Sequence, residues 1–160
     1  MNKFDEVEFK KLKNSVATEY KKIISIYSPA LKAEIFFNAK GLYHLRYDNG
    51  QHERNKLVQQ NKLRFFSSGL EIIKVSTTIQ EYRRGLCCVS KPSKDNPHQE
   101  SLVEWFAFFS VISFIKQIRV KTVVRRIGGE NGRFHFWSVM PFWSLHNNKR
   151  LLGLKEIENK

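Results

Sequence analysis

The stretch from residue 117 to residue 140 constrains the fold most, because apolar and polar side chains alternate along it. Read with a two-residue period, one set is apolar: Ile118, Val120, Val124, Phe134 and Phe136. The positions between them carry cations, an imidazole and an indole: Arg119, Lys121, Arg125, Arg133, His135 and Trp137. Such alternation is typical of strands with one buried face. The glycine-rich segment 128–132 predicts a hairpin loop between strands at 117–127 and 133–140.

The hairpin predicts which side chains lie opposite one another. Symmetric closure on the loop places Arg125 opposite His135 and Val123 opposite Trp137, with Cβ atoms about 5 Å apart. A guanidinium beside an imidazole opposes its protonation, so His135 is a candidate general base. The indole of Trp137 offers a nucleic-acid base a surface for stacking. The alternative for His135 is an exposed strand histidine that only stacks on Trp137.

Helical patterns precede the hairpin. Apolar residues recur at steps of three and four near the N-terminus, which predicts an amphipathic helix within residues 1–31 that Pro29 stops. Ser68 and Glu71 form a capping-box pattern for a short helix. The other expected elements are strand 33–38, helix 53–65, an extended segment at 79–89, a loop at 90–101 and strand 102–114.

This order of elements predicts the fold class. Helices followed by a run of strands favour an α+β fold, with N-terminal helices packed on a small antiparallel sheet. The length of 160 residues fits one domain. We therefore expect a single domain over residues 1–160, with a C-terminal extension at 143–160.

The charge of the chain indicates its class of partner. Lys and Arg number 28 against 15 Asp and Glu, a formal net charge of +13. Such an excess favours a polyanion, and RNA is the partner that we expect. Cys87 and Cys88 are adjacent and lack metal-ligand spacing, and no uncharged run reaches the ~20 residues of a membrane span. We expect a cytoplasmic protein that needs no cofactor and has no membrane partner.

Four further residues are candidates for the site. His44 and Arg46 share a face if they lie on a strand and diverge if they lie on a helix. Arg54 belongs to a polar helix and is a candidate phosphate contact, although a solvated helix face explains it equally well. Ser138 falls on the apolar side of its strand, where its hydroxyl needs a partner and is either structural or orients another group.

The motifs resemble a known superfamily. His44-Leu-Arg46 precedes a sheet that ends in Val-Val-Arg-Arg-Ile-Gly (123–128) and His-Phe-Trp-Ser-Val-Met (135–140). This resembles the barnase, EndoU, colicin-nuclease and RelE-like (BECR-type) superfamily of small metal-independent ribonucleases, and most of all its phage- and mobile-element-associated branches. The resemblance covers residues 33–142 and implies a nuclease-like core there.

The resemblance also implies roles for single residues. His44 would match the early histidine of the superfamily, and Arg46 the basic residue beside it. Arg125 would match the sheet arginine, and His135 or Ser138 the late polar residue. Many members act as toxins, which implies a cognate antitoxin or immunity protein as a second partner.

These observations favour a toxin-like endoribonuclease that cuts RNA by attack of the 2′-hydroxyl and leaves a 2′,3′-cyclic phosphate. His135 and His44 would share the base and acid roles, with Arg125 and Arg46 stabilising the phosphate. The RNA, whether tRNA, mRNA or ribosome-bound RNA, would be held by Arg54, Arg119, Lys121, Arg133 and Trp137.

Two alternatives remain open from the sequence. One is a non-catalytic nucleic-acid-binding protein of a mobile element or phage, in which the same basic face contacts phosphates and transfers no proton. The other is a ribosome- or protein-associated factor that uses its aromatic surface.

Overall fold

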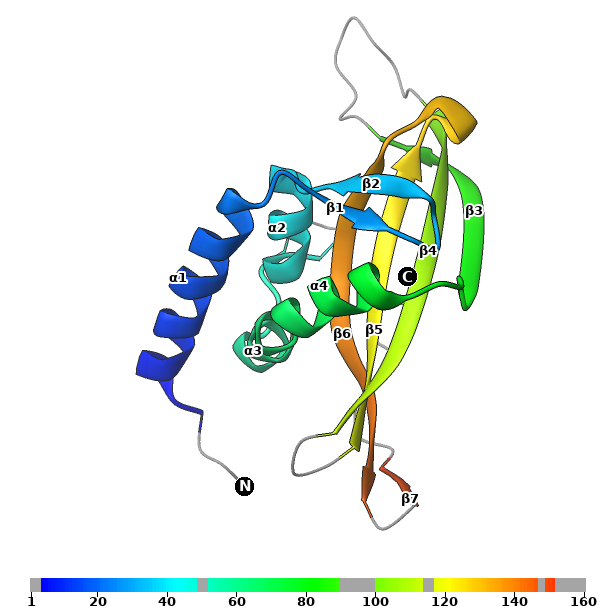
Figure 1. The fold of residues 1–160 in the computed structure, drawn as a ribbon. Coiled ribbons are helices and arrows are strands. Elements are labelled where there is room, and N and C mark those ends of the chain that lie inside the picture. The colour runs from blue at the N-terminus through cyan, green and yellow to red at the C-terminus, as the bar shows by residue number, and fades with distance from the viewer. Residues whose placement is uncertain (1–3, 49–51, 90–99, 114–116, 147–148, 152–160) are drawn as a thin grey trace, which may run out of the picture.

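Helices cover one side of a seven-stranded mixed sheet in the computed structural model of the chain (Figure 1). The structure describes residues 4–48, 52–89, 100–113, 117–146 and 149–151. The helices are α1 (Glu6–Lys22), α2 (Ala39–Arg46), α3 (Lys56–Arg64) and α4 (Phe66–Val75). The strands are β1 (Ser25–Ser28), β2 (Ala33–Phe36), β3 (Glu81–Cys88), β4 (Glu100–Ser113), β5 (Gln117–Ile127), β6 (Phe134–His146) and β7 (Lys149–Leu151). The predicted α+β class is confirmed.

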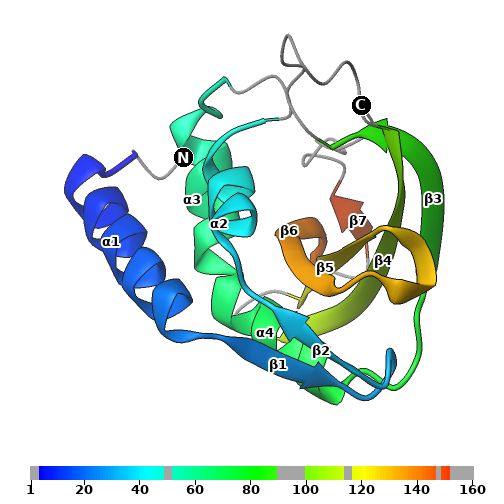
Figure 2. The same cartoon turned by 90° about the horizontal axis from the view of Figure 1, so that it is seen from above.

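The sheet has the strand order β1-β2-β6-β5-β4-β3, with β7 also paired to β6. From β6 to β3 every pair is antiparallel, as predicted, whereas β2 joins β6 in parallel. The predicted antiparallel sheet is thus confirmed from β6 to β3, and the β1–β2 hairpin, added to its edge in parallel, makes the whole sheet mixed. Seen from above, the twisted sheet curls, with α1, α2 and α3 on one side and β3 on the other (Figure 2).

The N-terminal helix is shorter than the sequence predicts. Asp5 caps α1, and its carboxylate accepts hydrogen bonds from the backbone N–H groups of Val7 and Glu8. The helix ends at Lys22 rather than near Pro29. The apolar residues that follow, Ile26 among them, form β1, which pairs antiparallel with β2. Strand pairing thus overrides the helical spacing of these residues.

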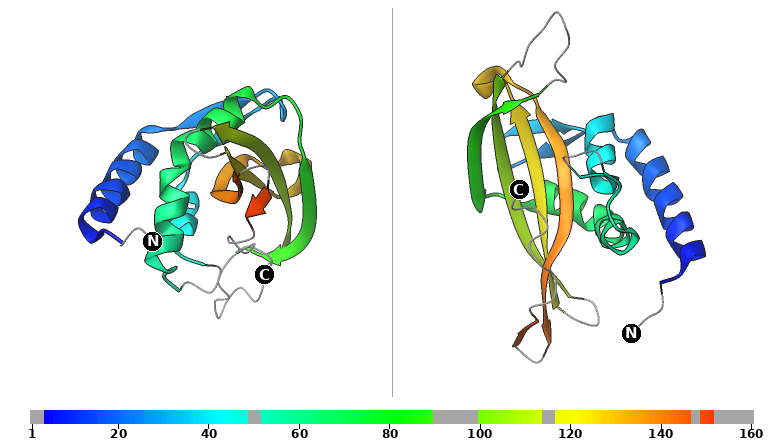
Figure 3. Two further views of the ribbon diagram at one scale, coloured as in Figure 1. Left: turned by 90° about the horizontal axis from the view of Figure 1, so that it is seen from below. Right: turned by 180° about the vertical axis from the view of Figure 1, so that it is seen from behind.

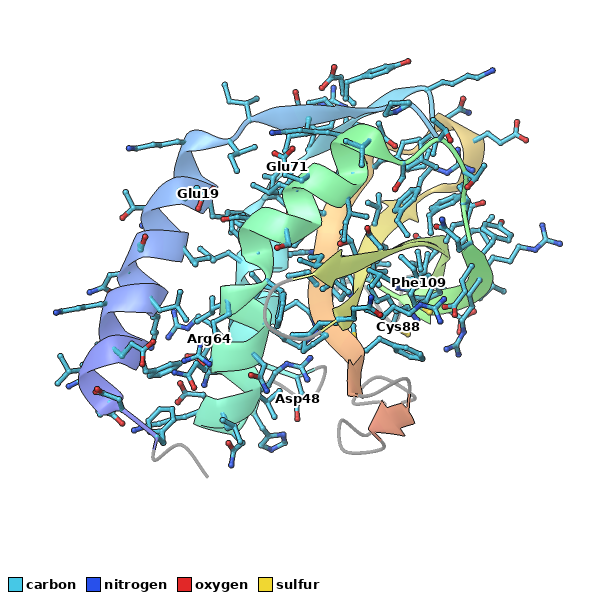
Figure 4. All side chains as sticks on the ribbon, turned by 60° about the horizontal axis from the view of Figure 1, so that its bottom comes forward. Glu19, Asp48, Arg64, Glu71, Cys88 and Phe109 are labelled. Atoms are coloured by element: carbon cyan, nitrogen blue, oxygen red, sulfur yellow. The ribbon has the colours of Figure 1, made fainter. Side chains whose placement is uncertain are left out.

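Helices α3 and α4 follow one another almost without a break. Phe65 separates them, and α4 begins at Phe66, so Ser68 lies inside the helix and caps nothing. The predicted capping box is therefore wrong. Ion pairs link α3 to α1, from Lys56 to Glu6 at 2.9 Å and from Arg64 to Glu8 at 3.2 Å. Figure 4 labels Arg64 on the side of α3 that faces α1. All four groups are well exposed, so each pair contributes little to stability.

The core lies between the helices and one face of β4, β5 and β6. The apolar set predicted from the alternation does face this core, since Val120, Val124 and Phe136 are fully buried. Other buried residues of the same cluster are Leu45, Leu63, Phe66, Leu70, Ile73, Phe106, Phe108 and Val139. From behind, β3 to β6 lie side by side with the helices at one edge (Figure 3).

A β-bulge interrupts the alternation in β6. Arg125 lies opposite His135, as predicted, but Val123 lies opposite Ser138 instead of Trp137. Trp137 is the extra residue on β6, and beyond it Val139 returns to the buried face opposite Thr122. The predicted Val123–Trp137 pair is wrong because β6 has one extra residue between two regularly paired stretches. No local sequence pattern predicts this insertion.

Helix α2 packs tightly on β6 through Gly41. A Cβ atom added there would lie 2.5 Å from the backbone oxygen of Phe136 and would also collide with the hydroxyl of Tyr20. We expect Gly41→Ala to lower the free energy of unfolding by about 1–3 kcal/mol, since the helix must move off the strand. Urea unfolding measures this loss.

Gly85 in β3 provides the matched control. A Cβ atom added to Gly85 has no described atom within 4 Å. We expect Gly85→Ala to leave stability unchanged or to raise it slightly, because alanine reduces the freedom of the unfolded chain. Equal losses in the two variants would contradict the tight contact at Gly41.

Candidate functional site

The candidate site lies on the sheet face away from the core, where Arg125 of β5 faces His135 of β6. The register places these residues directly opposite one another, as the hairpin predicts. The side chains of both are partly buried. Among the described residues, the Nε atom of Arg125 is buried and has no hydrogen-bond partner. Buried polar atoms without a partner are unusual in a folded protein, and of the four in the described residues only Nε of Arg125 lies beside His135.

Burial and neighbouring cations keep the imidazole of His135 neutral. Burial is the largest cause that lowers its pKa below the usual value of about 6.5. The positive charges of Arg125, Arg133 and Lys40 lower the pKa further, while a hydrogen bond with the backbone of Arg133 opposes them. A neutral imidazole can accept a proton, so the expected general-base chemistry is available at neutral pH.

The indole of Trp137 joins this pair to helix α2. The guanidinium carbon of Arg125 lies 3.5 Å from the centroid of the indole ring. The ring of His44 stacks on the same indole at 4.2 Å with 20° between the planes. Burial lowers the pKa of Arg125 to about 10, so its guanidinium stays charged at neutral pH and attracts the aromatic face. Three residues that the sequence singled out are therefore in contact.

His44 is placed differently from the expectation that it meets RNA directly. It belongs to α2 and is 5% exposed. Its Nε2 atom lies 3.5 Å from Nη2 of Arg54, whose Nε donates to the backbone oxygens of His44 and Tyr47. Arg54 thus fixes the end of α2, although the sequence suggested a phosphate contact.

Arg46 does not join His44. The helical backbone sends the two side chains in different directions, which decides between the two alternatives left open by the sequence. The guanidinium of Arg46 lies 5.4 Å from the ring centroid of Tyr47. The structure therefore does not bring His44 and Arg46 together as one catalytic unit.

Ser138 has a structural partner. Its hydroxyl accepts a hydrogen bond of 2.7 Å from Nζ of Lys62 on α3. Ser138 is fully buried and Lys62 is only 2% exposed. The partner that the buried hydroxyl required is thus a lysine from a distant helix, and a substrate outside the protein reaches neither group.

The remaining predicted cations lie on aromatic rings. Arg119 is 4.1 Å from the ring centroid of Phe109, and Lys121 contacts the same ring at 5.4 Å and pairs with Glu81 at 2.7 Å. Arg133 is exposed and lies 5.3 Å from the ring of Phe36. Figure 4 labels Phe109 on β4, on the sheet beyond the helices. Of the three cations, only Arg133 belongs to the surroundings of His135.

Sequence reasoning missed two residues of the site. Trp105 of β4 lies opposite Arg125, and Arg83 of β3 lies opposite Trp105. The guanidinium of Arg83 is 5.8 Å from the indole centroid of Trp105. The alternation in 102–114 is hidden by apolar residues on both faces, so the outward direction of Trp105 follows only from its pairing with β5.

The described part of the chain offers neither a metal-binding cluster nor a membrane-spanning helix. It contains no group of three or more His, Cys, Asp or Glu side chains that could hold a metal ion. None of its helices combines the length and the apolar character that crossing a membrane requires. No protein family, curated protein or solved structure matches this chain.

Proposed function

We propose that this protein is a metal-independent endoribonuclease whose centre is His135. The observation that carries the proposal is the register of β5 and β6, which sets a neutral imidazole opposite a guanidinium with an unsatisfied donor. Arg133 adds a second cation beside them. The base can take the proton of the 2′-hydroxyl and the two cations can stabilise the phosphate, while water can supply the proton of the leaving 5′-oxygen.

The reaction follows from these groups. The neutral imidazole of His135 removes the proton of the 2′-hydroxyl, and the 2′-oxygen forms a bond to the adjacent phosphorus. The bond from phosphorus to the 5′-oxygen, on the opposite side of phosphorus, breaks; that oxygen takes a proton from water, and the imidazolium of His135 returns its proton to the solvent. Arg125 and Arg133 stabilise the charge on the phosphate oxygens during the transfer. The products are a 2′,3′-cyclic phosphate and a free 5′-hydroxyl.

His44 receives a positioning role in this proposal. Its ring is nearly buried and stacked on Trp137, so an RNA would have to displace the indole to reach it. His44 and Arg54 hold Trp137, and Trp137 holds the guanidinium of Arg125. The share in the base and acid roles that was expected for His44 is therefore replaced by an indirect role.

The activity is tested directly with purified protein and total RNA in excess EDTA. We expect cleavage that survives EDTA and leaves cyclic-phosphate ends. Products with other ends, or cleavage that requires added metal, would rule out this mechanism. A toxin of this kind would act on cytoplasmic RNA, and growth arrest on expression, relieved by a cognate antitoxin, would agree with it.

The pH dependence of the reaction is a separate prediction. A general base works when it is deprotonated, so kcat/KM should fall as the pH drops through the pKa of His135. Because that pKa is lowered, the acidic limb should have its midpoint below about 6.5. Arg125→Met removes one cation that lowers this pKa and should move the midpoint to higher pH. A wild-type midpoint above about 6.5 would contradict the neutral-base assignment.

A second candidate function is a nucleic-acid-binding protein without catalysis. The observation in its favour is the burial of His44, which leaves one histidine at the site where two would be expected. Tight binding to RNA that weakens steeply with salt, together with no cleavage in EDTA, would establish this function instead.

A further inference from the structure

We propose that the sheet face at His135 continues as a binding track for single-stranded RNA across β6, β5, β4 and β3. This inference rests on the proposed function, because it assigns the substrate class of the same site. The residues of the track are Arg83, Trp105, Arg125 and His135, with Trp137 beside them.

The track is a single row of paired residues. Arg83 lies opposite Trp105, Trp105 opposite Arg125, and Arg125 opposite His135. Residues opposite one another on neighbouring strands point to the same face of a sheet. With ~4.8 Å between strands, three steps give a row of roughly 14 Å that runs across the strands. At the far end of the row, Phe36 of β2 pairs with His135 and extends it by one strand.

The row alternates cations with aromatic rings. Arg83 is exposed, and Trp105, Arg125 and His135 are each partly exposed. Cations placed at intervals meet the phosphates of a strand, while an indole between them stacks a base. Trp105 is paired with Arg83 on one side and Arg125 on the other. The next paired residues along the strands, Ala107 and Val123, are buried, so the accessible part of this face is the row itself.

This pattern fits a single strand and does not fit a duplex. In a duplex the bases are already stacked and paired, so an indole on a sheet cannot stack on a base face. In a single strand every base has a free face, and stacking is tolerant of sequence. We infer that the protein prefers unpaired RNA with most of its bound nucleotides on one side of the scissile phosphate, because the row extends three strands from His135 toward Arg83 and only one strand toward Phe36.

The test measures binding without cleavage. A 2′-O-methyl oligonucleotide lacks the nucleophile, so its affinity reports on the track alone, as a single strand and as a duplex with its complement. We expect the single strand to bind at least about 10-fold more tightly than the duplex. Trp105→Ala should weaken the single strand by roughly 5- to 100-fold, and Trp105→Phe, which keeps a ring, should recover most of the affinity.

Adjacent arginines of β3 supply a matched control. Arg83 is on the track, whereas Arg84 pairs with Glu104 and points to the other face. Both side chains are exposed, so both alanine variants remove one charge without disturbing the core. Arg83→Ala should reduce the slope of log affinity against log salt by about one, and Arg84→Ala should leave the slope near that of the wild type.

The outcomes separate the track from the enzyme. Equal binding of single strand and duplex, or equal effects of Arg83→Ala and Arg84→Ala, would overturn the track, whatever the cleavage assay gives. Confirmed preference for the single strand with no cleavage of ordinary RNA in EDTA would sustain the track and remove the ribonuclease. Because Arg83 and Arg84 are exposed, their alanine variants should fold normally. The salt dependence of their RNA affinity therefore tests the track even if the Trp105 variants fold poorly.

Discussion

Replacement of His135 by alanine is expected to slow RNA cleavage in EDTA by about 10²–10⁴-fold, the usual contribution of a positioned general base. The methyl group of alanine cannot take the proton of the 2′-hydroxyl, whereas Arg125 and Arg133 remain to bind the phosphate. The loss should therefore appear mainly in kcat, with a smaller change in KM. Initial rates of the two proteins on the same RNA measure it.

His52 and His44 serve as controls for this result. His52 is exposed, and its Nδ1 atom lies 3.7 Å from the carboxylate of Asp48. The proposed mechanism gives His52 no role, so His52→Ala should keep the wild-type rate. His44→Ala should lose activity through Trp137, and the loss should become small when Trp137→Ala is already present. A His135→Ala protein with full activity would end the ribonuclease assignment. A His44→Ala loss that persists in the Trp137→Ala background would return His44 to a direct role.

Replacement of Phe136 by alanine is expected to lower the free energy of unfolding by about 3–5 kcal/mol. Phe136 is fully buried. Its ring stacks on that of Phe37, with 5.1 Å between the ring centroids. It makes edge-to-face contacts with Phe66 and Tyr20, with centroid distances of 5.7 Å and 6.0 Å. Removal of the ring leaves a cavity that these three neighbours cannot fill, because Tyr20 and Phe66 are held in α1 and α4 and Phe37 in the short segment between β2 and α2.

Urea unfolding of Phe136→Ala beside Phe4→Ala measures this effect with the same chemical change. Phe4 is 37% exposed and contacts Phe9 at 5.5 Å, so its loss should cost less than about 1 kcal/mol. Similar losses in both variants would show that Phe136 is not at the centre of the core. Because Phe136 lies between His135 and Trp137 in β6, its loss should also reduce cleavage at temperatures where the variant remains folded.

Local patterns in the sequence predict the central hairpin well. The alternation in 117–136 and the glycine-rich loop predict strands, a buried face and the Arg125–His135 pair, and the structure confirms all three. These features depend on neighbours in the chain, for which a two-residue period carries the needed information.

The features that the sequence did not predict depend on residues far apart in the chain. Lys62 belongs to a polar helix, and its burial requires the hydroxyl of Ser138, 76 positions away. The burial of His44 depends on Trp137, and the outward face of Trp105 depends on β5. The end of α1 depends on β2, which turns the residues after Lys22 into a strand. Each is a tertiary contact that overrides a local preference.

The bulge at Trp137 shifts the alternation of buried and outward-facing residues in β6 by one position. Before it, even-numbered residues such as Phe136 face the core, and after it the odd-numbered Val139 does. Without this extra residue, Phe136 and Val139 would be two positions apart and would both face the helices in a regular strand, so the bulge adds Trp137 to the site without disturbing the core. Relatives of this chain that keep its site should therefore keep the extra residue, with an aromatic side chain that contacts Arg125 and His44. A one-residue gap in an alignment at position 137 would identify those that have lost it.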